Sequence, residues 1–232
     1  MPSIKSLSFF NLFISLEIGE IFGDMTVPVM AVQSLENEVL KNIKRDNISL
    51  DTYADYQQKF HSIGSRTYSD LIVPLPGETL HSHLAALREL MSLGVDIIQN
   101  HNMRLLAGAE TNDPKTRKKF NFKTRCRLIH GDAGIYHDGN GHELRVFEFE
   151  ESLRQTSTMN EDELFYLRKI HFLVDLCWNI EVYKPLLKLA MAYGVNPVDI
   201  LIKVLESSTE NKNSISSEFW RKLDEYSQQE WF

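Results

Sequence analysis

The sequence predicts an α/β fold in which strands alternate with helices over the first 110 residues, followed by a mostly helical region that contains a β-hairpin. Residues 68–73 form a short run rich in branched apolar side chains that a Pro-Gly turn stops, as expected for a buried strand. Thr79 is a good N-cap for an amphipathic helix that ends near Gly94, and a second apolar run at 95–98 follows at once. Strand, helix and strand in this order predict a βαβ unit with parallel strands.

The composition is that of an ordinary globular protein of 232 residues, with 43% hydrophobic and 25% charged residues. The formal net charge of −7 argues against a dedicated nucleic-acid binder. The two cysteines, Cys126 and Cys177, are far apart. This usage excludes a disulfide framework and a cysteine-rich metal or cluster site built from this chain alone, and it predicts a reducing, cytoplasmic setting.

The N-terminal stretch has an apolar run at 7–16 that follows one cation, Lys5. A signal peptide is one interpretation, but Glu17 and Glu20 follow where a small-residue cleavage site would be expected. These acidic residues favour a strand or helix buried against the domain. No stretch approaches the roughly 20 apolar residues that a membrane span needs, so no membrane partner is expected.

Further elements precede and follow the βαβ unit. Residues 25–33 predict a buried strand, and Ser34 is expected to cap a helix after it. Ser49 is expected to cap a second helix, which Gly64 ends. With the strand that runs from 95 towards 103, the first part has three parallel strands. Three strands cannot close a barrel, so at least one edge is expected to stay open.

The second half is expected to begin with a hairpin, because residues 126–129 and 142–150 flank a Gly/Asp-rich turn at 138–141. Its long loop is either a polar hairpin loop or a group of metal-ligand types. The side chains in question are His130, Asp132, His137, Asp138, His142 and Glu143.

Helices are expected after the hairpin. Thr158 or Asn160 caps the first, which has acidic residues in its first turn. Residues 181–193 form the next, and Asn196 with the following proline opens another. Residues 207–217 are expected to be a polar linker before a short tail helix.

A local basic patch lies between residues 113 and 129: Lys115, Arg117, Lys118, Lys119, Lys123, Arg125 and Arg127. It is a solvated helix face, a contact for phosphate or carboxylate groups, or a nucleic-acid contact whose affinity would fall steeply with salt. His81 and His83 are expected on the surface at a helix start, and His171 is expected to be buried with a partner.

Four short segments resemble a known family. Residues 31–35 (Ala-Val-Gln-Ser-Leu), Lys44-Arg45, 69–72 (Ser-Asp-Leu-Ile) and 75–79 (Leu-Pro-Gly-Glu-Thr) resemble the second half of a radical S-adenosylmethionine (radical SAM) domain. The closer likeness is to its cobalamin-binding and coproporphyrinogen-dehydrogenase-like branches. The resemblance covers about residues 25–110. It implies a partial (β/α) TIM-like barrel over residues 1–110, with an accessory region of hairpin and helices over 111–232. It also implies S-adenosylmethionine, a 4Fe-4S cluster and, in some members, cobalamin as cofactors.

The resemblance also implies a cofactor-binding set. Gln33 matches a position that bonds the ribose or methionine part of S-adenosylmethionine, Arg45 one that reaches its carboxylate, and Asp70 one that contacts the ribose hydroxyls. Arg104 joins this set at the mouth of the strands, where an organic small-molecule substrate would bind. Guanidinium groups suit carboxylates, and carboxylates accept from vicinal hydroxyls. The alternative is that Arg45 is a surface cation near a helix C-terminus and Asp70 a strand-start cap. Glu78 is expected to help cap the helix after the turn.

Two departures from the family pattern stand out. Pro74 occupies a position where many members carry glycine, and it has no N–H to donate. The Cys-x3-Cys-x2-Cys motif that holds the cluster in the family is absent from this sequence. We therefore expect a fragment or truncated member of a radical SAM enzyme that does not assemble a cluster alone. Its partner would be an N-terminal half or another chain. The alternative is a non-catalytic relative that acts as a binding or interaction protein.

Overall fold

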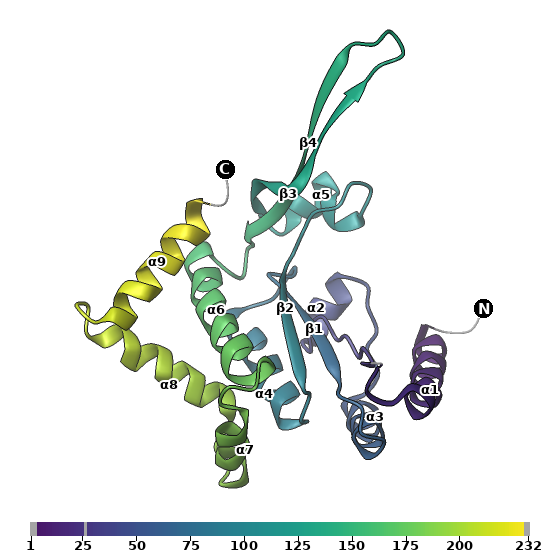
Figure 1. Ribbon diagram of the computed structural model, residues 1–232, viewed down its shortest axis with the longest axis vertical. Coiled ribbons are helices and arrows are strands. Elements are labelled where there is room, and N and C mark those ends of the chain that lie inside the picture. Colours follow the sequence, from purple (N-terminus) through teal and green to yellow (C-terminus); the bar gives the residue numbers. More distant parts are fainter. Residues whose placement is uncertain (1–3, 26, 230–232) are drawn as a thin grey trace.

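The computed structural model describes residues 4–25 and 27–229, without the side chains of residues 4–12, 24, 130 and 132. At its centre, strand β1 (Tyr68–Val73) pairs in parallel with β2 (Ile97–Asn102) (Figure 1). Helix α4 (Leu80–Ser92) connects them. It begins as expected, because the Thr79 hydroxyl accepts from Ser82 N at 3.0 Å in a capping box. The βαβ prediction is confirmed.

The segment 27–33 lies on the other side of β1, where the sequence predicts the first strand. Met30 N donates to Tyr68 O and Gln33 N to Asp70 O, both at 2.8 Å, in two isolated parallel bridges. The order and direction agree with the prediction, but the segment is not a continuous strand. Gln33 has a φ of +60°, which breaks the extended backbone. The described residues form small sheets and no closed barrel, so the partial barrel stays a prediction.

Two helices follow the segment 27–33, which we call the edge segment, and only one of them begins at the predicted N-cap residue. Helix α3 (Leu50–Ser62) has Ser49 as its N-cap, as predicted, with the hydroxyl accepting from Thr52 N at 3.1 Å. The prediction that Ser34 caps a helix is wrong. Helix α2 (Asn37–Asn42) has Glu36 at its N-cap position, and the Ser34 hydroxyl donates instead to Glu78 Oε1 at 3.2 Å.

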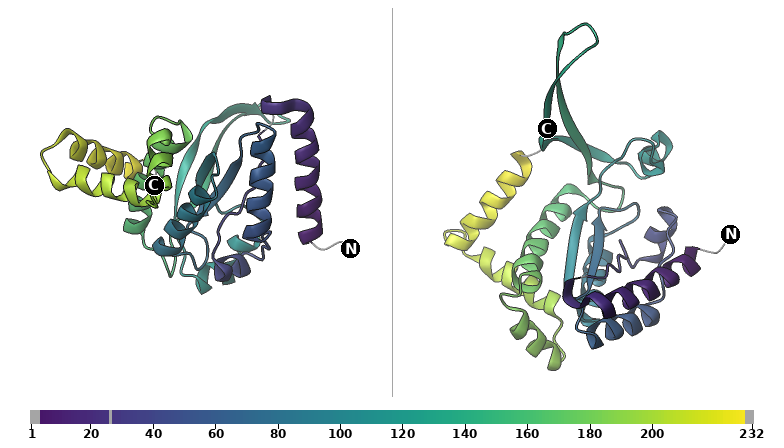
Figure 2. Two further views of the ribbon diagram at one scale, coloured as in Figure 1. Left: turned by 90° about the horizontal axis from the view of Figure 1, so that it is seen from below. Right: turned by 45° about the vertical axis from the view of Figure 1, so that its right-hand side comes forward.

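The N-terminal stretch is a helix, α1 (Ile4–Phe22), followed by the 3-10 turn η1 (Gly23–Met25). It packs alongside α3 (Figure 2). Gly19 permits the close approach, since a Cβ there would lie 2.9 Å from Ile63 Cδ1. The described part of α1 is therefore a helix that contacts the domain, but it is not buried as expected, since Phe13, Ile18, Ile21 and Phe22 are exposed. No single described helix has the length and apolar character to cross a membrane, although α7 and α8, bent by 119°, pass together on length and composition.

A long antiparallel hairpin, β3 (Lys123–His137) and β4 (Glu143–Gln155), projects away from the rest of the molecule (Figures 1 and 2). The 3-10 turn η2 (Glu110–Asn112) and helix α5 (Pro114–Lys119) precede it. The strands are longer than predicted and the turn shorter. Its first residue, Asp138, accepts from His142 N at 2.9 Å. A register shift lies between Leu128 and Ala133.

The C-terminal region is helical: α6 (Glu161–Val174), the π-helix η3 (Asp175–Asn179), α7 (Lys184–Ala192), α8 (Pro197–Glu210) and α9 (Ile215–Gln229). Asn160 caps α6, in agreement with one of the two candidates. The polar linker predicted from residue 207 is wrong in its first part. The hydroxyls of Ser208 and Thr209 donate to Leu205 O at 2.8 and 3.0 Å, so these polar residues stay within α8.

One hydrophobic cluster extends across the N-terminal and C-terminal parts of the chain, and the helices α6 to α9 lie on the β2 side (Figure 1). Trp178 is fully buried and donates through Nε1 to Val95 O at 2.8 Å. The Asn179 side chain donates to Ile98 O and accepts from Ile98 N, both at 2.9 Å. These bonds fasten η3 to β2. The domain boundary at residue 110 stays a prediction.

Candidate functional site

Asp70 lies on the less buried face of β1, where intermediate and buried residues alternate. Its Oδ1 accepts from the Tyr68 hydroxyl at 2.6 Å and contacts His101 Nε2 at 2.9 Å. Its side chain is 24% exposed, and Oδ2 has no partner among the described residues. Burial, with the hydrogen bond to Asp70, raises the pKa of Tyr68 to about 12, so this phenol stays a donor at neutral pH. The arrangement is a carboxylate with one free oxygen on an accessible sheet face.

Gln33 lies opposite Leu71, the residue after Asp70, in the sheet. Its backbone bonds on both sides of Leu71: Gln33 N donates to Asp70 O at 2.8 Å, and Ile72 N donates to Gln33 O at 2.9 Å. Its side chain is half-buried and makes no hydrogen bond with the described residues. Asp70 is the third residue of β1, whereas the alternative from the sequence was a cap at the start of the strand. The structure brings this predicted pair together through the backbone.

Arg45 holds the edge segment from outside. Its Nη2 donates to Ala31 O, and its Nε donates to Asn47 Oδ1 at 2.9 Å. Asn47 in turn donates to Val32 O at 3.0 Å and to Ser34 O at 2.9 Å. Burial lowers the pKa of the guanidinium. The arginine therefore has a structural task, since it satisfies a backbone carbonyl of the sheet edge.

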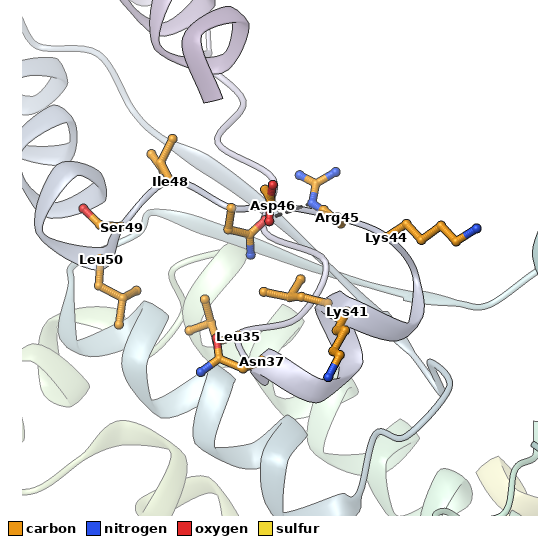
Figure 3. A pocket seen from close by; sticks show the side chains of 11 residues that line it. Leu35, Asn37, Lys41, Lys44, Arg45, Asp46, Ile48, Ser49 and Leu50 are labelled. Carbon is orange, nitrogen blue, oxygen red and sulfur yellow. Dashed lines mark hydrogen bonds between the residues drawn. The ribbon is translucent and has the colours of Figure 1, made fainter. Parts of the chain in front are cut away.

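Arg45 also lines a pocket of about 660 Å³ between α2 and the segment 44–50, which leads into α3 (Figure 3). Lys41 and Lys44 lie on the same pocket, with Asp46 as the acidic neighbour. Gln33 and Asp70 do not line it. The cofactor-binding set as a whole stays a prediction.

Arg104 is oriented towards the hairpin. Its Nε lies 2.8 Å from Glu150 Oε2, and Arg127 pairs with the same carboxylate. Residues 103–105, which come directly after β2, lie antiparallel alongside β4, and Leu153 N donates to Met103 O at 2.9 Å. Arg104 thus lies just beyond the carboxyl end of β2, but its positive charge is already paired with Glu150.

Glu78 is a buried carboxyl that the sequence interpretation assigned only a capping role. It is 0% exposed, and its Oε1 accepts from the hydroxyls of Ser34 and Ser82, both at 3.2 Å. Its Oε2 has no partner among the described residues. Burial raises its pKa to about 7, against the opposing effect of the two hydroxyls. The contact with Ser82, part of the α4 capping box, agrees with the capping expectation, whereas the contact with Ser34 was not predicted.

The buried His83 and the half-buried His171 form a pair, with their Nε2 atoms 2.9 Å apart. The prediction that His83 is a surface residue is wrong, because this face of α4 packs against α6; His81 is exposed as expected. Burial lowers the pKa of both, that of His83 to about 4. Both rings are therefore neutral at pH 7, and His171 has a partner as predicted.

The metal interpretation of the hairpin loop gains no support from the described side chains. Asp138 Oδ2 contacts His142 Nδ1 at 3.0 Å, which fixes the turn, and the side chains of His130 and Asp132 lie outside the described part. Among the described residues, no group of three or more His, Cys, Asp or Glu could hold a metal ion.

The basic patch divides into two parts. Its arginines pair with carboxylates of the hairpin and α6: Arg117 with Glu151, Arg127 with Glu150, and Arg125 with Glu161. Its lysines form no ion pair with the described residues. The solvated-helix interpretation holds only for α5, because residues 123–127 belong to β3.

Comparison with known proteins gives two relatives and no matching family model. The cobalamin-dependent radical SAM methyltransferase TokK of Streptomyces tokunonensis is 30% identical over 154 residues. The 2-(S-pantetheinyl)-carbapenam-3-carboxylate methyltransferase of Streptantibioticus cattleyicolor is 24% identical over 154 residues. The chain is similar to radical SAM enzymes. Each match covers 64% of this chain but only 22% of the relative, so the chain spans about a fifth of their length.

The cysteines of this chain do not fit an iron–sulfur cluster. Such clusters are held by several thiolates. Cys126 is half-buried on β3 and Cys177 is buried in η3, where burial raises the pKa of its thiol. A raised pKa disfavours the thiolate form that binds metal. The polar groups at Asp70 and Gln33, in contrast, suit a ligand that carries hydroxyl groups.

Proposed function

We propose that this chain contributes the S-adenosylmethionine-binding part of a radical SAM methyltransferase that acts on an organic small molecule. The observation that carries the proposal is the similarity over 154 residues to two methyltransferases, one of which is named as a cobalamin-dependent radical SAM enzyme. The parallel order of the edge segment, β1 and β2 agrees with it. Cluster ligands would come from residues other than those of this sequence, and cobalamin would be the methyl carrier in the assembled enzyme.

The tasks of the individual residues follow from their free hydrogen-bonding groups. Asp70 Oδ2 would accept from the vicinal ribose hydroxyls while Tyr68 and His101 hold the carboxylate in place. The half-buried Gln33 amide would bond the ribose or methionine part next to it. Arg45 Nη1, for which no hydrogen bond is found within the described ranges, would donate to the ligand carboxylate, and Arg104 would have to exchange its contact with Glu150.

Calorimetric titration of the chain with S-adenosylmethionine tests the proposal. We expect saturable binding that Asp70→Asn weakens about tenfold to a hundredfold, since a hydrogen bond to a charged group contributes about 1.5–3 kcal/mol. Asp55→Asn is the matched control, because Asp55 is also a carboxylate paired with a neighbour, Lys59, at 2.7 Å. Absence of saturable binding, or equal affinity in Asp70→Asn and the wild type, would contradict the proposal.

A second candidate function, that of an interaction protein, is favoured by the hairpin. Phe147 and Phe149 are 60% and 63% exposed on a projecting two-stranded arm, next to the exposed Leu128 and Ile135. Isolated hairpins are marginally stable in water, and exposed apolar patches often mark partner contacts. A stable complex with a partner chain in size-exclusion chromatography, without S-adenosylmethionine binding, would favour this second function.

A further inference from the structure

A pocket of about 430 Å³ lies between α2 and α5 and carries four lysines. We call it the lysine pocket. Its charged lining is Lys41, Lys44, Lys115, Lys119 and Glu110. Helix α2 follows the edge segment, and η2 and α5 follow β2, so the pocket is built from chain that leaves the carboxyl ends of parallel segments. In open α/β sheets this is the end at which ligands bind.

The charge of the lysine pocket is positive although the whole chain has a net charge of −7. Glu110 is the acidic residue of the lining, and it pairs with Lys44 at 2.6 Å, whereas Lys41 pairs at 3.7 Å with Glu38, which does not line the pocket. Lys115 and Lys119 make no ion pair with any residue in the described ranges, and Lys119 Nζ lies 4.5 Å from the centre of the Phe120 ring. Like charges that face one cavity repel each other, so their accumulation favours an anion between them.

The neighbouring arginines do not share this property. Arg117, from the same helix as Lys115 and Lys119, is bound to Glu151 and to Asn112 Oδ1 at 2.9 Å. The basic patch of the sequence therefore separates into arginines that pair with carboxylates at the hairpin base and lysines without an ion pair in the described ranges, of which Lys115 and Lys119 line the pocket. The proposed function gives no role to the lysines that line the pocket.

The remaining lining indicates the class of anion. Thr111 and Thr116 provide hydroxyls, and Ile43 and Phe120 provide apolar wall. Lysine ammonium groups act as point charges with three donors each, whereas planar carboxylates are bound best by guanidinium forks. Several ammonium groups around one cavity suit an anion that carries more than one negative charge. A phosphate or diphosphate group has this chemistry.

We infer that the lysine pocket binds the phosphate or diphosphate group of a small molecule. That this molecule is the substrate of the methyl transfer rests on the proposed function, whereas the binding itself does not. An extended nucleic acid is a poorer fit, because its recognition needs a basic stripe along a surface and the chain is acidic overall.

The test is calorimetric titration with inorganic pyrophosphate at low ionic strength. We expect saturable binding that Lys115→Gln/Lys119→Gln weakens at least about tenfold. The matched control, Lys118→Gln/Lys123→Gln, removes two lysines of the same stretch that do not line the pocket, and should leave the affinity within about twofold. Glu110→Gln should strengthen binding severalfold, because it removes the competing carboxylate.

Three outcomes would overturn the inference. They are no saturable binding of pyrophosphate, an equal loss in the control variant, and binding of acetate as tight as that of pyrophosphate. The strengthening by Glu110→Gln cannot come from misfolding, so it separates a direct effect from a structural one. Pyrophosphate binding without S-adenosylmethionine binding would contradict the proposed function alone, and the reverse result would contradict this inference alone.

Discussion

The buried carboxyl of Glu78 should make the stability of this protein fall as the pH rises towards 7. Its pKa is raised from 4.5 to about 7 by burial, so the folded state holds this proton where the unfolded chain has lost it. Stability therefore decreases with pH between about 4.5 and 7 through this group. The difference corresponds to about 3 kcal/mol at pH 8, at 1.36 kcal/mol for each pKa unit.

The substitution Glu78→Gln removes the ionisation and keeps a side chain of the same size. We expect the variant to match the wild type at pH 4, below both pKa values, and to exceed its free energy of unfolding by up to about 3 kcal/mol at pH 8. Urea denaturation followed by circular dichroism at several pH values measures this. The control is Glu38→Gln on α2, where the carboxyl is exposed. A stability difference between Glu78→Gln and the wild type that does not change with pH would refute the reasoning.

Three further predictions concern packing and surface. Trp178→Phe removes the donor to Val95 O and should lower the free energy of unfolding by about 1–3 kcal/mol in chemical denaturation. His83→Leu and His171→Leu should each lower the free energy of unfolding by a similar amount, because either change leaves the other ring without its hydrogen-bond partner. The double variant should lose less than the sum of the two, and additive values in a double-mutant cycle would contradict this. Phe149→Ser should change the free energy of unfolding by less than about 0.5 kcal/mol but reduce self-association measured by light scattering, because Phe149 is exposed on the hairpin. Unchanged scattering would argue against the hairpin as a contact surface.

Local signals were sufficient for the elements whose ends carry their own capping residues. Ser49 and Thr79 cap α3 and α4 as predicted, and Gly64 and Gly94 follow their ends with φ near +78°. Ser34 has the same chemistry, but the left-handed Gln33 before it directs the chain away from a helix. The hydroxyl is then used by Glu78, which is 44 residues distant in sequence.

The candidate site depended on information that lies outside any local pattern. His101 contacts Asp70 because the register of β1 and β2 places them on one face, and no spacing within either strand indicates this. His83 is buried by a helix that begins near residue 161, so its position at the start of α4 was misleading. The similarity to a family suggested Arg45 as a ligand group, whereas its backbone contact to Ala31 follows only from the fold.

The side-chain amide of Asn179 occupies the positions at which the backbone of an additional strand would bond to Ile98. Growth of the sheet beyond β2 is therefore blocked by this chain itself, and Lys184 Nζ, which donates to Asp96 O at 2.9 Å, extends the block by one residue pair. On the opposite border Arg45 occupies Ala31 O, and Val29 remains 58% exposed. A further strand, from this or another polypeptide, would therefore have to pair with the edge segment next to Val29, so the sheet can be extended on that edge and not beyond β2.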